Sequence, residues 1–300
     1  MIEVRGLRKE YGAFVAVEDS SFTVDRGEVF GIIGPNGAGK TTTLKSLAGL
    51  LEPTEGSVEV SGEPADARET RRRLGFLPEE SPLYEEMTAV SYLEFFADLY
   101  DVPDDVATTR IHDALDRLEL EHRRRAIGDM SKGMKRKVAI ARSLVNDPDV
   151  LVYDEPASGL DPLTTNYIIE FTKELAAEGR TIVFSAHNLY HVEEVCDRVA
   201  IMNEGRIVAE GALGDLRDRY GATEYRVFTT VEVPGASAEG DRYRRVVESM
   251  ADVESVRKAA VENGGAIDDI RTVEPTLEGL FLDLADSEGR GHSDSEATEA

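Results

Sequence analysis

The sequence predicts an α/β fold with a mixed sheet, flanking helices and antiparallel strands near the N-terminus. Three observations support this. A short apolar strand runs straight into a glycine-rich loop and a helix within residues 29–51. The order strand, helix, strand appears at 149–186, which is typical of a parallel crossover unit. Residues 79–146 between them are mainly helical in pattern. The chain therefore combines a strand-rich core with an inserted helical subdomain.

The first elements are short strands within residues 2–34, with the sequences IEVRGL, FTVDRG and EVFGIIG. A helix from about Thr41 to Leu51 has its apolar residues on one face and stops before Pro53. Helices of the inserted subdomain, about 80–146, are predicted at SYLEFFADLY, RIHDALDRLEL and KRKVAIARSLVN.

Strands return at DVLVYDEP and RTIVFSAH, separated by a helix that ends before Gly179. DRVAIMN and RIVAEG then predict a hairpin around Glu204 and Gly205. We expect a first domain over 1–215, a small α+β appendage over 216–285 and a disordered acidic tail over 286–300.

The acidic excess limits the partners of the chain. With 59 Asp and Glu against 34 Lys and Arg, the formal net charge is −25, which disfavours a polyanionic ligand, so we expect no nucleic-acid partner. Molar salt would screen the self-repulsion of such a chain, and the composition therefore suggests a halophilic source.

The sequence also suggests a location. No apolar run of membrane-spanning length occurs, and the first residues lack the layout of a signal peptide. We expect a cytoplasmic protein. Cys196 is the only cysteine, so an internal disulfide is impossible, and we expect an inert buried thiol without a role.

A phosphate-binding loop is the strongest motif. The residues from Gly34 to Thr41 read GPNGAGKT and match G-x-x-x-x-G-K-[ST]. Glycines let backbone N–H groups turn toward phosphate oxygens, and the following helix directs its positive end at the same charge. Lys40 would neutralise the outer phosphates and Thr41 would bind Mg²⁺. The motif predicts a P-loop NTPase core.

Two further strands end in candidate functional residues. VLVYDEP delivers Asp154 and Glu155, whose side chains diverge, so that one can face Mg²⁺ and the other the water that attacks the γ-phosphate. On its own the pair could merely end a strand. His187 closes TIVFSAH, and ligands of open α/β sheets gather at the carboxyl ends of strands. Alone, it would more simply be a satisfied core or surface group.

The order GPNGAGKTT, GFLPEE, MSKGMKRKVAIARSLV, VLVYDEP, SGLD and SAH resembles the nucleotide-binding subunit of an ATP-binding cassette (ABC) transporter across about residues 1–215. Within that family, SKGMKRK and EPTLEGLFLDL are most similar to the ATPases of ABC-2-type exporters.

The resemblance implies an ATP-hydrolysing enzyme with ATP and Mg²⁺ as cofactors. Asp154 would hold the metal with Thr41, Glu155 would polarise the water, and His187 would contact the γ-phosphate. Tyr11 would stack on adenine, although it could equally pack within its strand. The phosphates would be wrapped by Asn36, Gly37, Ala38, Gly39, Lys40, Thr41 and Thr42.

The resemblance also implies a second cassette. Ser131 and Gly133 belong to a signature, residues 130–134, that contacts ATP held by the opposite subunit, and Asp161 would link the two sites of a dimer. Each has a simpler interpretation: Ser131 and Asp161 can cap the helices that follow them, with or without a partner chain.

Two positions depart from the family pattern. Met130, Lys132 and Met134 replace the first, third and fifth members of Leu-Ser-Gly-Gly-Gln, and Lys132 could attract phosphate or simply face water. Glu79 stands where a glutamine commonly senses Mg²⁺; a carboxylate can still bind the metal but alters the charge near the attacking water.

The implied partners are an integral-membrane permease subunit and a second ABC cassette, in a homodimer. The chain would then lie on the inner face of the cell membrane through the permease. The stretch SPLYEEMTAVSYL could receive a helix of the permease, although core packing explains the same residues. Two alternatives are a soluble ABC ATPase acting on ribosomes or DNA and a nucleotide sensor without turnover.

Overall fold

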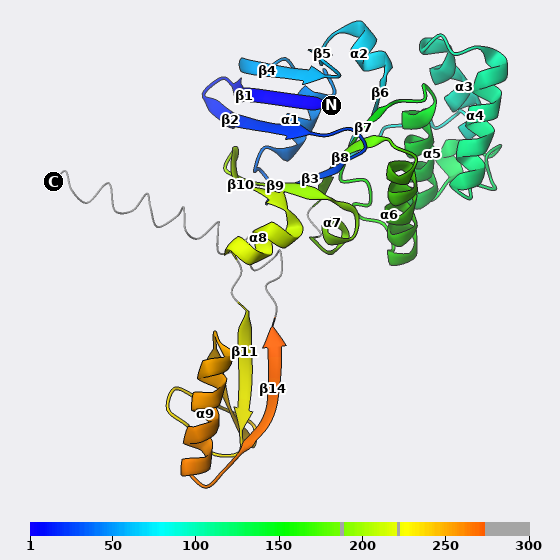
Figure 1. Ribbon diagram of the computed structural model, residues 1–300. Helices are drawn as coiled ribbons and strands as arrows, with labels where there is room; N and C mark the ends of the chain where they lie inside the picture. The colour runs from blue at the N-terminus through cyan, green and yellow to red at the C-terminus, as the bar shows by residue number, and fades with distance from the viewer. Residues whose placement is uncertain (187–188, 221–222, 274–300) are drawn as a thin grey trace. The chain divides into compact units, whose positions relative to one another are not determined.

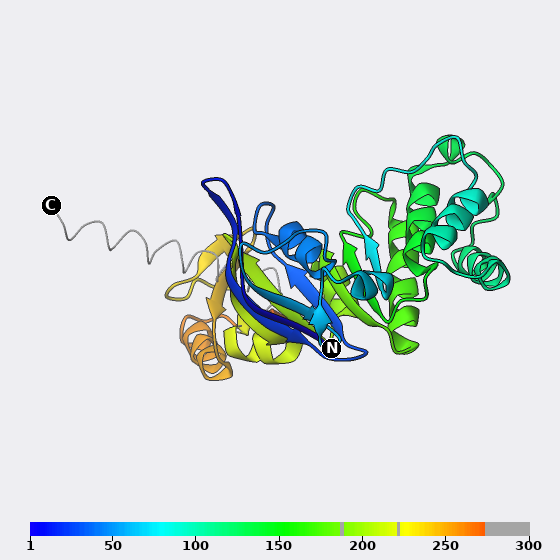
Figure 2. The ribbon, with the colours of Figure 1, turned by 90° about the horizontal axis from the view of Figure 1, so that it is seen from above.

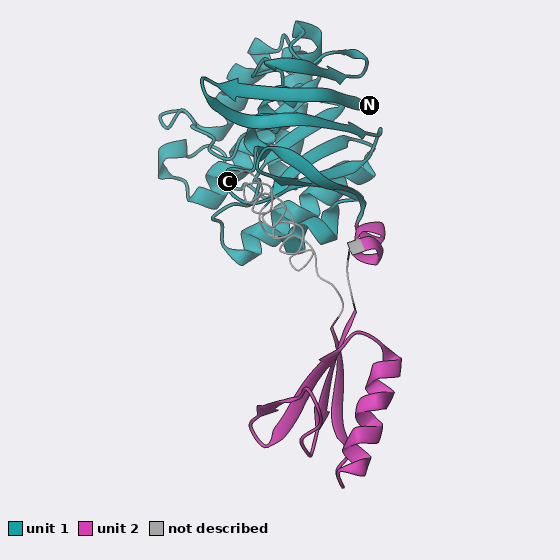
Figure 3. Ribbon diagram, turned by 90° about the vertical axis from the view of Figure 1, so that its left-hand side faces the viewer, with its two compact units in different colours: residues 1–212 teal, residues 213–300 magenta. Residues whose placement is uncertain are grey.

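The chain divides into two compact units, one over residues 1–212 and one from residue 213 onward (Figure 3). The computed structural model describes residues 1–186, 189–220 and 223–273. His187, the predicted tail over 286–300 and the segment EPTLEGLFLDL lie outside the described residues. Each unit is therefore considered by itself.

The first unit is built on a six-stranded sheet with the order β10-β9-β3-β8-β7-β6 (Figure 1). Neighbouring strands are parallel except for β10, which forms an antiparallel hairpin with β9 around Glu204 and Gly205. This confirms the predicted mixed sheet and hairpin. The strands are β3 (Val29–Ile33), β6 (Leu74–Leu77), β7 (Val150–Asp154), β8 (Thr181–Ala186), β9 (Arg198–Asn203) and β10 (Arg206–Ala212).

A second, antiparallel sheet has the order β2-β1-β4-β5. Its first two strands are longer than expected, because register shifts between Val4 and Glu10 interrupt the alternation of buried and exposed residues that reveals a strand in sequence. The sheet confirms the antiparallel N-terminal strands. Its members are β1 (Ile2–Tyr11), β2 (Phe14–Val24), β4 (Glu55–Val60) and β5 (Glu63–Pro64).

Helix α1 (Lys40–Leu47) lies between the two sheets, contacting β2 and β4 of one and β7 and β8 of the other. Thr43, Leu44 and Leu47 are buried on it. The helix ends at Leu47 rather than Leu51, because the chain turns at Gly49 with a left-handed φ of 63°.

Helices gather beside the β6 edge of the six-stranded sheet, where α5 contacts β6 (Figure 2). The three predicted helices of this region are present but start earlier, as α3 (Ala89–Leu99), α4 (Asp104–Arg117) and α5 (Lys132–Leu144). Thr88 and Ser131 cap α3 and α5, which accounts for two of the earlier starts. The remaining helices are α2 (Arg68–Arg72), the 3₁₀ turn Ile127–Asp129, α6 (Pro162–Ala177) and α7 (Leu189–Val195).

The second unit is an α+β arrangement with its own small core. It begins with α8 (Leu213–Tyr220), and a four-stranded antiparallel sheet of order β12-β13-β11-β14 follows. Helix α9 (Met250–Glu262) packs on this sheet through Val253, Val256 and Ala260. The strands are β11 (Glu224–Thr229), β12 (Ser237–Glu239), β13 (Arg242–Val247) and β14 (Ile267–Val273).

Two sequence features have direct structural counterparts. None of the helices in the described ranges has both the length and the apolar character needed to span a bilayer. Cys196 is buried, and burial raises the pKa of its thiol, so that the reactive thiolate is suppressed.

Candidate functional site

The phosphate-binding loop, residues 34–42, begins after the carboxyl end of β3 and includes the first three residues of α1. Gly39 caps α1 with φ of 101°, and a Cβ there would come within 2.5 Å of the Ala16 carbonyl oxygen. Lys40 is 7% exposed. Its Nζ donates to the carbonyl oxygens of Gly34 at 2.8 Å and Pro35 at 3.1 Å. The loop is therefore folded around its own lysine.

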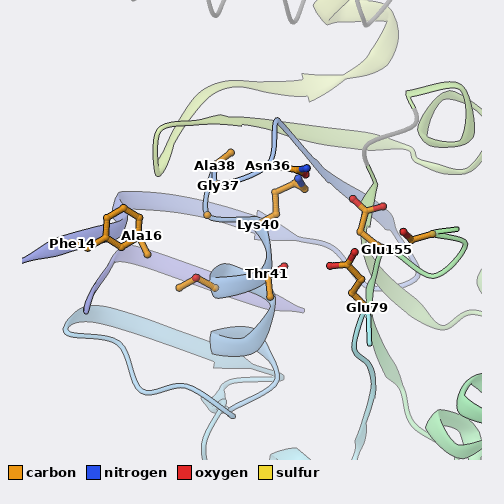
Figure 4. A pocket seen from close by; sticks show the side chains of 12 residues that line it. Phe14, Ala16, Asn36, Gly37, Ala38, Lys40, Thr41, Glu79 and Glu155 are labelled. Atoms are coloured by element: carbon orange, nitrogen blue, oxygen red, sulfur yellow. The ribbon is translucent and has the colours of Figure 1, made fainter. Parts of the chain in front are cut away.

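A cavity of about 570 Å³ lies over this loop. Figure 4 shows Lys40 and Thr41 between Phe14 on one side and Glu79 with Glu155 on the other. The predicted residues from Asn36 to Thr42, together with Glu79 and Glu155, all line one space. The complete lining is Phe14, Ala16, Asn36, Gly37, Ala38, Gly39, Lys40, Thr41, Thr42, Glu79, Glu155 and Ser158.

The two acidic residues at the end of β7 point in different directions. Asp154 is 1% exposed, and its Oδ1 accepts a hydrogen bond of 2.6 Å from the Ser185 hydroxyl. Glu155 has a left-handed φ of 47°, which is uncommon for a non-glycine residue, and its side chain lines the cavity. The Ser185 hydroxyl also accepts from the Glu155 N–H at 2.9 Å. One serine thus fixes both residues.

Sequence reasoning missed Ser185, Phe14 and Ser158. The signal for Ser185 is a polar residue near the carboxyl end of TIVFSA, a strand that is buried throughout. Such a hydroxyl needs a hydrogen-bond partner, and the neighbouring strand offers the Asp154 carboxylate.

The aromatic residue in the cavity is Phe14 rather than the predicted Tyr11. The two residues face each other across the β1–β2 hairpin and are 49% and 62% exposed for Tyr11 and Phe14 respectively. Lys9 Nζ lies 5.7 Å from the centre of the Tyr11 ring. Only Phe14 is part of the cavity lining, so the stacking role of Tyr11 stays a prediction.

The signature residues lie at the start of α5 and outside the cavity lining. Ser131 is exposed, and its Oγ accepts from the Met134 N–H at 3.2 Å, which confirms the helix cap. A Cβ on Gly133 would lie 3.1 Å from Thr164. A Cβ on Gly159 would lie 2.3 Å from Lys132 Nζ, so this ammonium group rests on the loop that follows β7. Lys132 is also exposed, in keeping with the prediction that it faces water, and a role toward phosphate stays a prediction.

Asp161 caps α6, as predicted. Its carboxylate accepts from the Thr164 N–H at 3.0 Å and from the Thr164 hydroxyl at 2.6 Å. These hydrogen bonds lower the pKa of Asp161. The capping role does not by itself test the predicted role in a dimer.

The oxygen ligands near the loop suit a magnesium ion that arrives with a nucleotide. Within the described ranges, no group of three or more His, Cys, Asp or Glu could hold a metal alone. The cavity presents the Thr41 hydroxyl and the Glu79 carboxylate, with Asp154 adjacent to Glu155. Mg²⁺ commonly takes one or two carboxylates and completes its shell with phosphate oxygens and water.

This fold and loop define a P-loop nucleotide-binding protein. The family model described as ABC transporter matches residues 17–158. The chain is 42% identical over 214 residues to Nod factor export ATP-binding protein I of Burkholderia lata, which covers 70% of each chain. It is 42% identical over 208 residues to ABC transporter ATP-binding protein NatA of Bacillus subtilis, which covers 67% of this chain and 83% of that protein.

Solved structures agree. An ATP-binding subunit of an ABC transporter is 38% identical, with a TM-score of 0.68 over 74% of this chain and 93% of that chain. A cassette solved as a dimer in a post-hydrolysis state with ADP and Pi is 26% identical, with a TM-score of 0.66 over 71% and 99%.

The chain belongs to the family of ABC transporter ATP-binding proteins. It is an ATP-binding cassette of a transporter, and it hydrolyses ATP. The transporter relatives favour this function over a ribosome- or DNA-directed ATPase and over a nucleotide sensor.

Proposed function

We propose that the chain powers an ABC-2-type exporter by binding Mg-ATP between two copies of itself and hydrolysing it. The observation that carries this proposal is that the cavity over the phosphate-binding loop and the signature residues lie apart on the same chain. The phosphate-binding loop, Glu79 and Glu155 share a cavity, whereas Ser131 is exposed at the N-terminal end of α5 and absent from that lining. A second copy would supply the missing contacts. The export proteins among the relatives support the direction of transport.

The proposed roles follow from position and chemistry. Lys40 and the loop amides bind the phosphates, because a helix N-terminus and a lysine both favour negative charge. Phe14 or Tyr11 stacks on the base. Glu155 accepts the proton of the attacking water, since its carboxylate faces the cavity from a fixed backbone. His187, which follows β8, contacts the γ-phosphate.

Thr41, Asp154 and Glu79 would hold Mg²⁺, which supplies charge neutralisation at the phosphates when bound. In a dimer, Ser131 can keep its helix cap and still donate its hydroxyl hydrogen to a phosphate of the partner's nucleotide, because a hydroxyl is both donor and acceptor. Asp161 would likewise serve as cap and as a link between the two sites.

Glu155→Gln tests the chemistry. We expect hydrolysis to fall by about 10²–10⁴-fold, because an amide cannot act as the base. ATP binding should remain, and dimers should accumulate with ATP in sedimentation experiments. Glu80→Gln makes the same change in charge outside the cavity and is the matched control. Unchanged hydrolysis in Glu155→Gln would assign the base to another group.

The permease would dock on the helical region near Glu79. Tyr84 is 53% exposed and contacts Tyr92 and Phe95 edge-on. A nearby hollow of about 350 Å³ contains apolar side chains and arginines, listed in full as Ala48, Leu50, Arg68, Arg71, Arg72, Leu74, Phe76, Phe96, Leu99, Tyr100, Arg142 and Ser143. Apolar residues with charge around them suit an amphipathic helix. Such docking would hold the chain at the inner face of the membrane.

Leu83→Asp and Tyr84→Asp test this surface. Both should abolish transport in vesicles that contain the permease, while basal ATP hydrolysis of the isolated chain stays intact, because a buried carboxylate at the interface is unfavourable. Normal transport by both variants would move the docking surface elsewhere.

A further inference from the structure

Arg136 of α5 connects its own helix to two other chain segments of the nucleotide site. The residue is buried, with 8% of its surface exposed. Its guanidinium donates to two separate chain segments that carry cavity residues, one before α3 and one that includes the last residue of β7 and the turn after it. The acceptors are the carbonyl oxygens of Pro78 at 2.7 Å, Glu79 at 2.9 Å, Asp154 at 3.1 Å, Glu155 at 2.8 Å and Pro156 at 2.6 Å, and the Ser81 hydroxyl at 3.4 Å.

This arrangement is specific to arginine. The planar guanidinium has five N–H donors in a fixed fork, whereas lysine has three on one atom and glutamine has two. Burial lowers the pKa of Arg136 to about 10, and the neighbouring Asp154 opposes that shift. The group therefore remains charged at neutral pH. A buried cation is stable only when its hydrogen bonds are satisfied, and here carbonyl oxygens satisfy them.

The bonds fix the backbone under both cavity carboxylates. Glu155 has an unfavourable left-handed conformation. Its N–H is bound to Ser185 and its carbonyl oxygen to Arg136. Glu79, from the other segment, is bound through its carbonyl oxygen to the same guanidinium. The helix that carries Arg136 begins one turn earlier with the cap Ser131.

We propose that Arg136 is a positioning residue. It fixes the carboxylates of Glu155 and Glu79 relative to each other and to Ser131 at the N-terminal end of α5. The cavity that holds one nucleotide and the signature residues that would contact the partner's nucleotide therefore move together. The proposal rests on the proposed roles of Glu155 and Ser131. Arg136 would affect hydrolysis by holding these residues in place and would not itself contact the nucleotide.

Arg136→Gln and Arg136→Lys in the full chain test the proposal. For Arg136→Gln we expect kcat to fall by at least about 10-fold, because small displacements of a base are costly. The affinity for ATP, measured by calorimetry, should stay within about twofold, because none of the hydrogen bonds of Arg136 to the described residues goes to the phosphate-binding loop. Arg136→Lys should fall between this variant and the wild type. Lys137→Gln, an adjacent cation whose Nζ lies 4.1 Å from the Tyr167 ring, is the control.

The split between kcat and affinity separates positioning from mere packing. Parallel losses of kcat, affinity and thermal stability in both variants, or two variants that do not fold, would reduce Arg136 to a structural residue. Wild-type kcat in Arg136→Gln would also overturn the proposal.

A second readout separates this proposal from the dimer itself. Sedimentation with ATP should show dimers for Glu155→Gln and weaker dimerisation for Glu155→Gln/Arg136→Gln. Absence of dimers in Glu155→Gln alone would reject the proposed dimer and with it the link to the signature. Equal dimerisation of the single and double variants would reject the link while leaving the proposed function intact.

Discussion

The phosphate-binding loop and the signature helix α5 each contain a buried cation, and the two are held in opposite ways. Lys40 and Arg136 are 7% and 8% exposed, and both donate to backbone carbonyl oxygens. The acceptors of Lys40 lie five and six residues away in the chain. Those of Arg136 lie 18 to 20 and 57 to 58 residues away. The phosphate-binding loop is therefore held by bonds within itself, whereas α5 is held by bonds to segments that are distant in the sequence.

This difference separates two tasks. A locally organised loop can present its amides to phosphate whatever the helical region does. The orientation of α5 instead depends on where β7 and the segment at Glu79 lie, so it can respond to events at those positions. We therefore expect changes at Lys40 to remove binding and changes near Arg136 to remove turnover.

The largest effect should come from Lys40→Met. Loss of the ammonium group removes the charge opposite the outer phosphates, so ATP binding should weaken strongly and hydrolysis should fall by more than about 10²-fold. Calorimetry and a phosphate-release assay check this. Retained affinity with lost hydrolysis would show that the loop and α5 do not divide the work as described.

A smaller effect is expected for Ser185→Ala. This change removes the hydroxyl that donates to Asp154 and accepts from the Glu155 N–H. Hydrogen bonds to charged groups contribute about 1.5–3 kcal/mol, so kcat should fall by roughly 10- to 100-fold with little change in ATP affinity. Ser185→Thr keeps the hydroxyl and is the control. A wild-type kcat in Ser185→Ala would mean that Glu155 needs no such support.

Asp161 allows its two roles to be separated. Asp161→Ala should lower the free energy of unfolding by about 0.5–2 kcal/mol because α6 loses its cap, whereas Asp161→Asn caps nearly as well. Urea unfolding measures this. If Asp161→Asn is as stable as the wild type but loses ATP-dependent dimerisation, the dimer role is established; normal dimerisation leaves Asp161 as a cap alone.

Salt should affect the site least. The net charge of −25 predicts that the melting temperature rises between about 0.1 and 1 M salt, because screening shortens from about 10 Å to 3 Å. Bonds of buried cations are screened much less. The ratio of kcat between Arg136→Gln and the wild type should therefore be constant across this range. A melting temperature that does not change with salt would argue against the halophilic origin.

The features that could be predicted from the sequence are mostly those that depend on short, local patterns. The loop from Gly34 to Thr42, the acidic end of β7 and the caps Ser131 and Asp161 are short sequence patterns. Lys40 and the two caps bond to near neighbours in the chain. The acidic pair at the end of β7 is recognisable as a pattern, although distant residues hold it in place. Arg136 acts through contacts between distant segments, so no local pattern identifies it. Ser185 gives only the weak signal of a polar residue in a buried strand, because its partner Asp154 lies on another strand. The long strand β1 was partly hidden by its register shifts, and Phe14 was missed because an exposed aromatic residue at a hairpin is not specific.

Helix α1 is enclosed by sheets on both sides, through contacts with β2, β4, β7 and β8. It cannot tilt or slide unless one of those layers separates, which would expose the core residues Leu44 and Leu47 to water. The proposed phosphate site therefore rests on a rigid support. We expect the motion that follows ATP turnover to occur in the helices beside β6. Helix α1 and the two sheets around it should stay in place during that motion.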